Sequence, residues 1–271
     1  MAIGLAFHVF AMGTQLIRRA SQVEEELAAR RAELSALQAE LADRELSLTT
    51  LLAELASFQG RYLREVGVLY AELDAWNARI AELLARCEDT EQAHTDAAQA
   101  RVQAEQTARA VRAETAQQRE FKPSLKLKRL YREVARKVHP DLATDNTDRA
   151  RRERLMAEAN AAYQRDDIEA LKRVLDEYES GEGYTLLTEA SVELERVIRQ
   201  IGQIRSRLSQ IEQQMTAFRA SSLAKLKARA DAAKSDGRDL LAEMALDVKG
   251  RIAAACLRFD SLSISDEVHE Q

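Results

Sequence analysis

Large apolar residues recur at every seventh position in the N-terminal third of the chain. The main column starts at Ala20 and continues through Leu27, Leu34, Leu41, Leu48, Leu55, Tyr62, Leu69, Trp76 and Leu83. A second column contains Leu16, Val23, Leu37, Leu51 and Phe58, and is interrupted by Arg30 and Arg44. Two apolar columns with this spacing are typical of the seam of a coiled coil. We therefore predict an N-terminal coiled coil over residues 16–119.

The apolar stripe of this predicted helix rotates near Gly60. Beyond that point the second column moves to Val66, Leu73, Ile80 and Cys87. Such a rotation predicts a bend in the helix or a change of partner. From Glu88 to Glu120 the sequence is rich in Ala, Gln, Glu and Arg. Because small side chains bury little apolar area, we expect this part to pack more weakly.

A second set of heptads follows the break at Ser180–Gly183. Its columns are Leu194, Ile201, Leu208 and Met215, and Val197, Ile204, Ile211 and Phe218. All of these positions are apolar, which predicts a second coiled-coil helix over residues 184–234. A turn near Gly237 then precedes a C-terminal helix, residues 238–260, with Leu241, Met244, Val248, Ile252 and Phe259 on one face. We expect the polar tail, residues 261–271, to be frayed.

Residues 1–15 form an apolar leader. The stretch lacks the preceding positive region and the clear cleavage site of a secretory signal, and it is short for a membrane span. We expect a helix leader or a misassigned start, and no membrane partner.

The segment from Lys122 to Tyr178 contains both prolines of the chain. Apolar residues at helical spacing form one stripe: Leu127, Leu130, Tyr131, Val134 and Val138. The outer face of the same helix is basic and contains Lys126, Lys128, Arg129, Arg132, Arg136 and Lys137. Ser124 can cap this helix, and Pro140 should end it near Val138. We then expect His139 and Asp141 to be exposed in a loop.

A second helix is expected after this loop. Asp145 and Asn146 favour a turn, and Thr147 or Asp148 can cap the helix. Its apolar face contains Leu155, Met156, Ala159, Ala162 and Tyr163, and continues to Ile168, Leu171 and Val174. The pattern predicts two antiparallel helices joined by a loop that Pro140 makes rigid.

Three features of residues 120–180 stand in a fixed order. They are Leu130-Tyr131 on the basic helix, the triplet His139-Pro140-Asp141, and Asn160-Ala161-Ala162-Tyr163 on the next helix. This arrangement resembles the J domain of the DnaJ co-chaperone family. The family's usual short first helix, with its aromatic and Leu-Gly residues, is not visible before Phe121. Either the helix that ends near Arg119 substitutes for it, or the domain is incomplete.

The resemblance implies a docking function. In that family the two helices form a finger that docks on a DnaK-type chaperone ATPase and stimulates its ATP hydrolysis. His139, Pro140 and Asp141 would then be the stimulatory triplet, and the basic residues from Lys126 to Lys137 would be the docking face. The implied structural core contains Leu130, Tyr131, Val134, Val138, Met156, Ala159, Asn160, Ala162 and Tyr163.

We expect an all-α fold in which long coiled-coil helices flank this hairpin. Because the two helices of the hairpin run antiparallel, the incoming helix near Arg119 and the outgoing helix near Tyr184 would be neighbours. They would form an antiparallel stalk that carries the J-like head. In the rival arrangement, either coil pairs with a second copy of the chain as a homo-oligomer, and heptads alone do not decide between the two.

The composition agrees with long helices. The 271 residues include only nine Gly and two Pro, whereas 31% are charged. Cys87 and Cys256 are too few for a disulfide framework or a zinc site, and they are compatible with a reducing cytoplasm. The sequence contains no phosphate loop and no pairing of a nucleophile with a base. We therefore expect no enzyme activity, no cofactor and no metal.

Three functions follow in order of preference. The first is a cytoplasmic co-chaperone that recruits a DnaK-type ATPase, with its coils directing it to one protein partner. The second is a coiled-coil scaffold or assembly factor whose J-like head is inert or serves only for docking. The third, nucleic-acid binding through the basic helix, lacks the interleaved exposed aromatic residues that stack on bases, and the net charge of −5 does not favour it.

Overall fold

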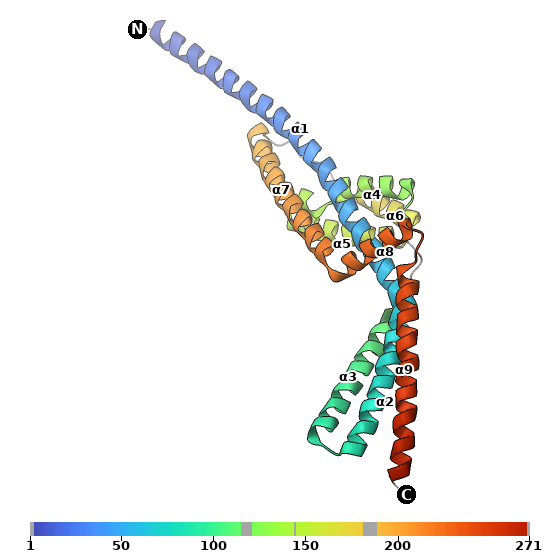
Figure 1. Ribbon diagram of the computed structural model, residues 1–271. Helices are drawn as coiled ribbons and strands as arrows, with labels where there is room; N and C mark the ends of the chain where they lie inside the picture. The colour runs from blue at the N-terminus through green and yellow to red at the C-terminus, as the bar shows by residue number, and fades with distance from the viewer. Residues whose placement is uncertain (1–2, 115–120, 144, 181–188, 270–271) are drawn as a thin grey trace. The chain divides into compact units, whose positions relative to one another are not determined.

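The computed structural model describes residues 3–114, 121–143, 145–180 and 189–269 (Figure 1). Within these ranges all regular structure is helical, which confirms the predicted all-α class. The helices are α1 (Ile3–Tyr62), α2 (Val68–Glu88), α3 (Glu91–Glu114), α4 (Leu125–Val138), α5 (Asn146–Gln164), α6 (Ile168–Ser180), α7 (Ala190–Ala220), α8 (Ser222–Ser235) and α9 (Leu240–His269). A π-helical turn, η1 (Leu63–Gly67), joins α1 to α2, and a 3-10 turn, η2 (Pro140–Leu142), follows α4.

The chain divides into two compact units, each built from two separate stretches of sequence. The first unit comprises Met1–Leu52 and Lys122–Phe218, and the second comprises Ala53–Phe121 and Arg219–Gln271. The boundary between Leu52 and Ala53 falls inside α1, so this helix contributes a core-forming face to both units.

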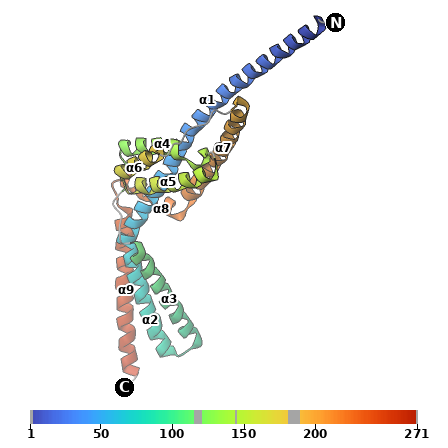
Figure 2. The same cartoon turned by 180° about the vertical axis from the view of Figure 1, so that it is seen from behind.

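The first unit contains a helix pair made by α1 and α7, which lie side by side in both ribbon views (Figures 1 and 2). Its buried seam consists of Leu27, Leu34, Leu41 and Leu48 from α1, with Val197, Ile201, Ile204, Ile211 and Met215 from α7. These are the apolar columns of the two predicted heptad series. The heptad pattern therefore identified the residues of the seam, because a continuous apolar stripe must be covered by another element.

The two helices of this pair run parallel, which corrects the predicted antiparallel stalk. Arg31 pairs with Glu193 at 2.6 Å, whereas Arg44 further along α1 reaches Glu212 further along α7 at 3.5 Å. Residue numbers therefore rise together along the pair. The prediction failed because it matched α7 with the stretch nearest in sequence, Glu88–Glu120. That stretch offers mainly alanine, whereas the leucines of α1 offer α7 far more apolar area.

Residues 53–121 do not continue as one coiled-coil helix, which corrects the predicted span 16–119. Helix α2 ends at Glu88, the following Asp89 adopts a left-handed conformation with φ 44°, and Thr90 caps the start of α3. Helix α3 then packs back along α2, where the Thr107 hydroxyl donates to the Asp74 carboxylate at 2.8 Å. The turn contains neither glycine nor proline, so the usual signals for a break were missing. The predicted rotation near Gly60 falls just before η1.

Helix α9 covers another side of α2 in the second unit. Leu73 and Ile80 of α2 pack with Val248, Ile252 and Ala255 of α9. The predicted boundaries change here as well: Ser221 caps a separate helix, α8, inside the span 184–234, and residues 184–188 lie outside the described residues. The backbone of α9 continues to His269, so most of the tail expected to be frayed is helical.

A pair of isoleucines in α7 tests the parallel seam. Ile211 is fully buried against α1, and Ile198 on the same helix is half exposed. We expect Ile211→Ala to lower the free energy of unfolding by about 2–4 kcal/mol, because it leaves a cavity between the two helices. Ile198→Ala, which makes the same chemical change without a cavity, should cost less than about 1 kcal/mol. Urea unfolding followed by circular dichroism measures both, and equal effects would contradict this seam.

Candidate functional site

The sequence predicts a site around the triplet His139-Pro140-Asp141, which follows α4 in the first unit. The Ser124 hydroxyl accepts a hydrogen bond from the Leu127 amide at 3.1 Å, as the predicted cap requires. Helix α4 ends at Val138, because His139 adopts an extended ψ of 133° and Pro140 follows it. The predicted cap and end of this helix are both confirmed.

Helices α4, α5 and α6 pack together into a three-helix group. Its fully buried side chains include Leu127, Tyr131, Val134, Val138, Leu155, Ala159, Ala162, Tyr163 and Leu171. The predicted core residues Leu130 and Asn160 are only half-buried. The second predicted helix is in fact two, since Asp166 has φ 58° and the Asp167 carboxylate caps α6 by accepting from the Ala170 amide at 2.9 Å. The hairpin expected from the sequence is therefore a group of three helices.

Helix α1 covers this three-helix group. The hydroxyls of Thr49 and Thr50 share hydrogen bonds with the phenols of Tyr131 and Tyr163, at 2.9 and 2.8 Å. The Tyr131 phenol also donates to the Asn160 side-chain oxygen at 2.6 Å, and burial raises the pKa of this phenol. The covering helix was expected to end near Arg119, but residues 115–120 lie outside the described part of the chain. Here the middle of α1 covers the group.

The structure buries His139, which corrects the prediction of an exposed loop histidine. Only 2% of the residue is accessible, and its Nε2 lies 3.2 Å from Oε1 of Glu45 in α1. Its Nδ1 accepts a hydrogen bond from the Asp141 amide at 3.1 Å. This pattern assigns the ring proton to Nε2, which therefore donates to Glu45. The prediction failed because it treated the loop as free, whereas α1 and α7 enclose it.

Glu45 links three elements through one carboxylate. It is 4% exposed, and its Oε1 accepts hydrogen bonds from His139 and from Arg207 Nε of α7, the latter at 2.8 Å. Burial alone would raise the pKa of Glu45, but the hydrogen bond from His139 and the charge of Arg207 outweigh it. The pKa of Glu45 therefore lies below its ordinary value. The ionised carboxylate is the form that holds these contacts.

Neither Glu45 nor Arg207 was picked out from the sequence, although a signal existed. In the heptad frame Glu45 takes an e position and Arg207 a g position, which flank the seam of a parallel helix pair. Arg31 with Glu193 repeats the same e-to-g relation two heptads earlier, at 2.6 Å. Comparing e and g charges of the two heptad series would therefore have indicated the parallel register.

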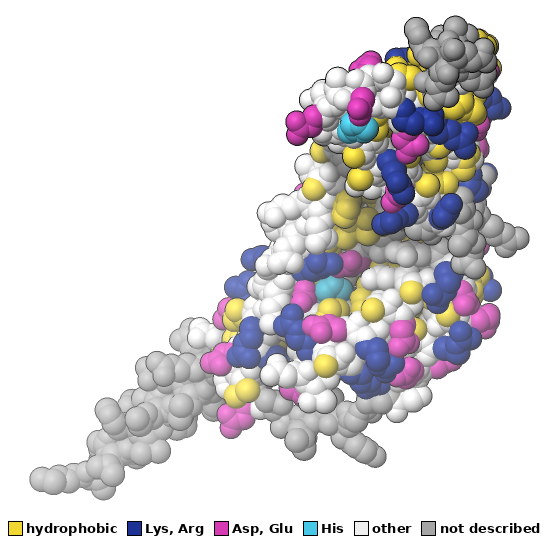
Figure 3. All heavy atoms as spheres, turned by 90° about the horizontal axis from the view of Figure 1, so that it is seen from below, with side chains coloured by type: hydrophobic (Ala, Val, Ile, Leu, Met, Phe, Trp, Pro, Cys, Tyr) yellow, Lys and Arg dark blue, Asp and Glu magenta, His cyan; other side chains and the backbone are white. Residues whose placement is uncertain are grey.

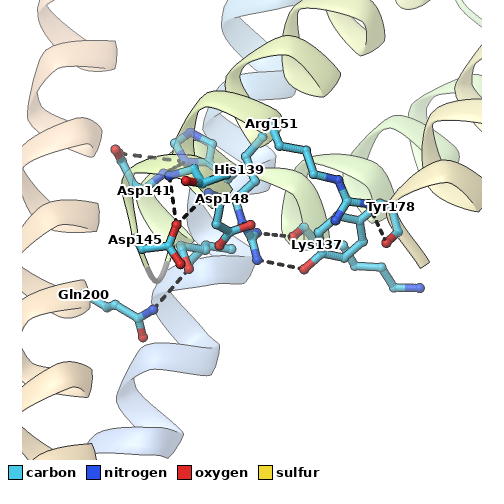
Figure 4. A network of polar contacts seen from close by, with 11 residues as sticks. Lys137, His139, Asp141, Asp145, Asp148, Arg151, Tyr178 and Gln200 are labelled. Atoms are coloured by element: carbon cyan, nitrogen blue, oxygen red, sulfur yellow. Dashed lines mark hydrogen bonds and ion pairs between the residues drawn. The ribbon is translucent and has the colours of Figure 1, made fainter. Parts of the chain in front are cut away.

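Arg152 of α5 is another residue of this site that was not picked out from the sequence. It is almost buried, and it donates to the Lys137 carbonyl at 2.7 Å and to the Tyr178 phenol at 2.8 Å. Its Nε also donates to both oxygens of the Asp148 carboxylate at 2.9 Å. This polar network, drawn in Figure 4, ties the last turn of α4 to α5 and α6. It holds the helix end from which the triplet departs.

The basic face of α4 is partly engaged. Lys126, Arg129, Arg132 and Arg136 are exposed, and Lys128 and Lys137 are half-buried. Arg132 pairs with Asp43 of α1 at 2.5 Å, and Arg136 donates to the Ser35 hydroxyl at 3.1 Å. Lys137 pairs with Glu179 of α6 at 2.7 Å. Among the residues that the structure describes, Lys128 and Arg129 have no ion pair, so this end of the face stays open.

A cleft of about 410 Å³ lies beside the triplet. Its walls include the triplet itself, Glu45, and Gln203, Arg207 and Gln210 of α7. Gln200 of α7 donates to the Leu142 carbonyl, just after the triplet, at 3.2 Å (Figure 4). Pro140 and Asp141 are half-buried at this cleft, so the triplet faces α7 rather than open solvent. In this conformation no large partner reaches His139 directly.

In the described ranges no group of three or more His, Cys, Asp or Glu side chains has the arrangement of a metal site, and Cys87 and Cys256 are not joined by a disulfide. Acidic and basic side chains alternate over the face drawn in Figure 3. In the part of the chain that the structure describes, no helix is long and apolar enough to cross a bilayer. No protein-family model, curated protein or solved structure matches this chain.

The buried carboxylate predicts a pH-dependent contribution to stability. Because its folded pKa is lowered, Glu45 contributes fully above its unfolded pKa, near 4.5, and the contribution disappears as the pH falls through the lowered value. Glu45→Gln should therefore lower the free energy of unfolding by about 1–3 kcal/mol at neutral pH, and the difference from the natural chain should shrink below pH of about 4.

Urea unfolding at neutral and acidic pH measures this difference. The control is Glu40→Gln, which changes an exposed glutamate that lies before Glu45 on α1. It should change the free energy of unfolding by less than about 0.5 kcal/mol. A Glu45→Gln effect that persists unchanged in acid would contradict the proposed role of the ionised carboxylate.

Proposed function

We propose that this chain is a co-chaperone of the J-domain type, which recruits a DnaK-type chaperone ATPase and stimulates its ATP hydrolysis. One observation carries the proposal. The triplet His139-Pro140-Asp141 occupies the turn directly after a basic helix, and that helix belongs to a compact group of three helices. We expect the chain to act in the cytoplasm, where it would meet such an ATPase.

The packing of the three-helix group supports this proposal. Leu130-Tyr131 and Asn160-Ala161-Ala162-Tyr163, which carried the resemblance, meet in space, with the rings of Tyr131 and Tyr163 4.8 Å apart between centroids. The hydrogen bond from Tyr131 to Asn160 joins the two motifs directly. Residues that match the family pattern thus serve one local purpose, which is to hold α4 against α5.

In this proposal the parallel pair of α1 and α7 is a coiled coil that carries the three-helix group and covers its triplet. Its apolar columns are already used within the chain, so any further protein partner would contact outward-facing positions of these helices. The covered state of His139 requires a second step before docking. Glu45 and Arg207 would have to release the triplet, which is a shift between a closed and an open conformation.

The burial of His139 also favours a second candidate, a scaffold or assembly factor whose J-like head is inert or serves only for docking. On this view Glu45 is a permanent structural partner of His139, and the three-helix group stabilises the helix pair. The two candidates differ in a measurable way. The scaffold would form stable complexes without any response of a DnaK-type ATPase.

A substitution in the triplet tests the co-chaperone proposal. We expect the full-length chain to accelerate single-turnover ATP hydrolysis by its host's DnaK-type chaperone, and His139→Gln to abolish the acceleration. His94→Gln, which changes an exposed histidine of α3, is the matched control and should stimulate like the natural chain. Circular dichroism checks that helicity is unchanged in both variants.

Three results would decide between the candidates. Stimulation that His139→Gln removes and His94→Gln retains supports the co-chaperone. Stimulation retained by His139→Gln would refute the role of the triplet. No stimulation by any of these chains, all of them folded, would leave the scaffold as the better proposal.

Releasing the triplet should increase activity if the closed conformation limits docking. Glu45→Gln weakens the contacts to His139 and Arg207 without removing the side chain's volume. We expect it to raise the stimulated rate several-fold at a subsaturating concentration of the chain, because a larger fraction would be open. Glu40→Gln on the same helix should leave the rate unchanged.

A decrease in the stimulated rate with Glu45→Gln would assign a different role to Glu45. A lower rate with Glu45→Gln, alongside normal folding, would show that Glu45 positions His139 for docking and does not restrain it. The same assay therefore separates a restraining contact from a positioning contact.

A further inference from the structure

Helix α9 is apolar on two opposite faces, and only one of them is covered. Val248, Ile252 and Ala255 pack on α2 in the second unit. On the opposite face, Leu246, Leu257 and Ile264 are 73%, 71% and 64% exposed. Large apolar side chains this exposed are individually common, but a line of them along one helix indicates an interaction surface.

The exposed residues fall on one heptad frame, which we call the outer stripe of α9. Its a positions are Gly250, Leu257 and Ile264, and its d positions are Leu246, Ala253 and Asp260. All of these residues are exposed, and an added Cβ at Gly250 would have nothing within 4 Å. The stripe covers about 27 Å of helix at 1.5 Å per residue. It thus offers a second helix an unobstructed seam.

We propose that the outer stripe of α9 pairs with the same stripe of a second copy of this chain, in antiparallel orientation. In an antiparallel helix pair each a position faces a d position of the other helix. A two-fold axis at Ala255 satisfies this rule at every layer of the stripe. Ile264 then faces Leu246 of the second copy, and Leu257 faces Ala253 of the second copy. Two large residues face each other in the outer layers, and Leu257 faces the small Ala253 nearer the axis. Only the layer of Asp260 lacks an apolar pair.

Charge selects this orientation. The two-fold axis places Asp260 opposite Gly250 of the second copy, where the missing side chain leaves space for the carboxylate. Lys249 of the second copy lies next to that space, so Asp260 and Lys249 form an ion pair twice by symmetry. A parallel pair would instead set Asp260 against Asp260 of the second copy, with like charges in contact. Within the described part of one chain, Lys249 and Asp260 have no ion pair, so both charges are available.

The stripe is one helix long and its centre contains small residues, so we expect a reversible dimer that depends on concentration. This dimer does not depend on the co-chaperone proposal, because α9 belongs to the second unit and the triplet to the first. Sedimentation velocity of the full-length chain over a range of concentrations measures it directly.

The test uses one apolar and three charge variants. Leu257→Glu should abolish the dimer without loss of helicity, since the side chain is exposed. Leu125→Glu is the matched control, because Leu125 is 74% exposed on α4, and it should leave the dimer intact. Lys249→Glu and Asp260→Lys should each raise the dissociation constant several-fold. The double variant, which restores opposite charges across the axis, should return it to near the natural value.

Each other outcome overturns the proposal. A chain that stays monomeric at high micromolar concentration has no such dimer. A dimer that survives Leu257→Glu uses another surface. A double charge variant that is no tighter than the single variants would rule out the antiparallel register.

Discussion

The Glu45 carboxylate is the contact on which the first unit depends. It lies between Arg207 of α7 and His139 after α4, and both hydrogen bonds end on the same oxygen. A buried carboxylate is stable only when its charge is compensated; Arg207 supplies the opposite charge, and His139 adds a hydrogen bond. The contact therefore couples the pairing of two long helices to the position of a short motif that lies far away in the sequence.

The parallel register follows from the same contact and its equivalents along the seam. Apolar columns at a and d positions bring α1 and α7 together, but they fit several registers almost equally well. Opposite charges at e and g positions, such as Arg31 with Glu193 and Glu45 with Arg207, are satisfied in one of them. Burial supplies most of the stabilisation, and the charges choose the alignment that places Arg207 beside the triplet.

This arrangement gives the two proposed functions a common physical basis. A co-chaperone with a covered triplet and a scaffold with a permanently buried one differ only in how readily the same hydrogen bonds open. The basic face of α4 is also partly covered and partly open. Arg132 and Arg136 contact α1, whereas Lys128 and Arg129 form no ion pair among the described residues. A docking partner would have to compete with α1 for part of this surface.

The sequence by itself determined the helical class and the residues that α1 and α7 contribute to their common seam. It also determined the cap and end of α4 and the core around Tyr131 and Tyr163. These features depend on local periodicity and on the backbone limits of proline, which a sequence displays directly. The tertiary structure decided which helix α7 pairs with, that α3 turns back at Asp89, and that His139 is buried. Each of these depends on which distant surface covers an apolar stripe, and such a choice is made by comparing contacts between segments that sequence order does not bring together.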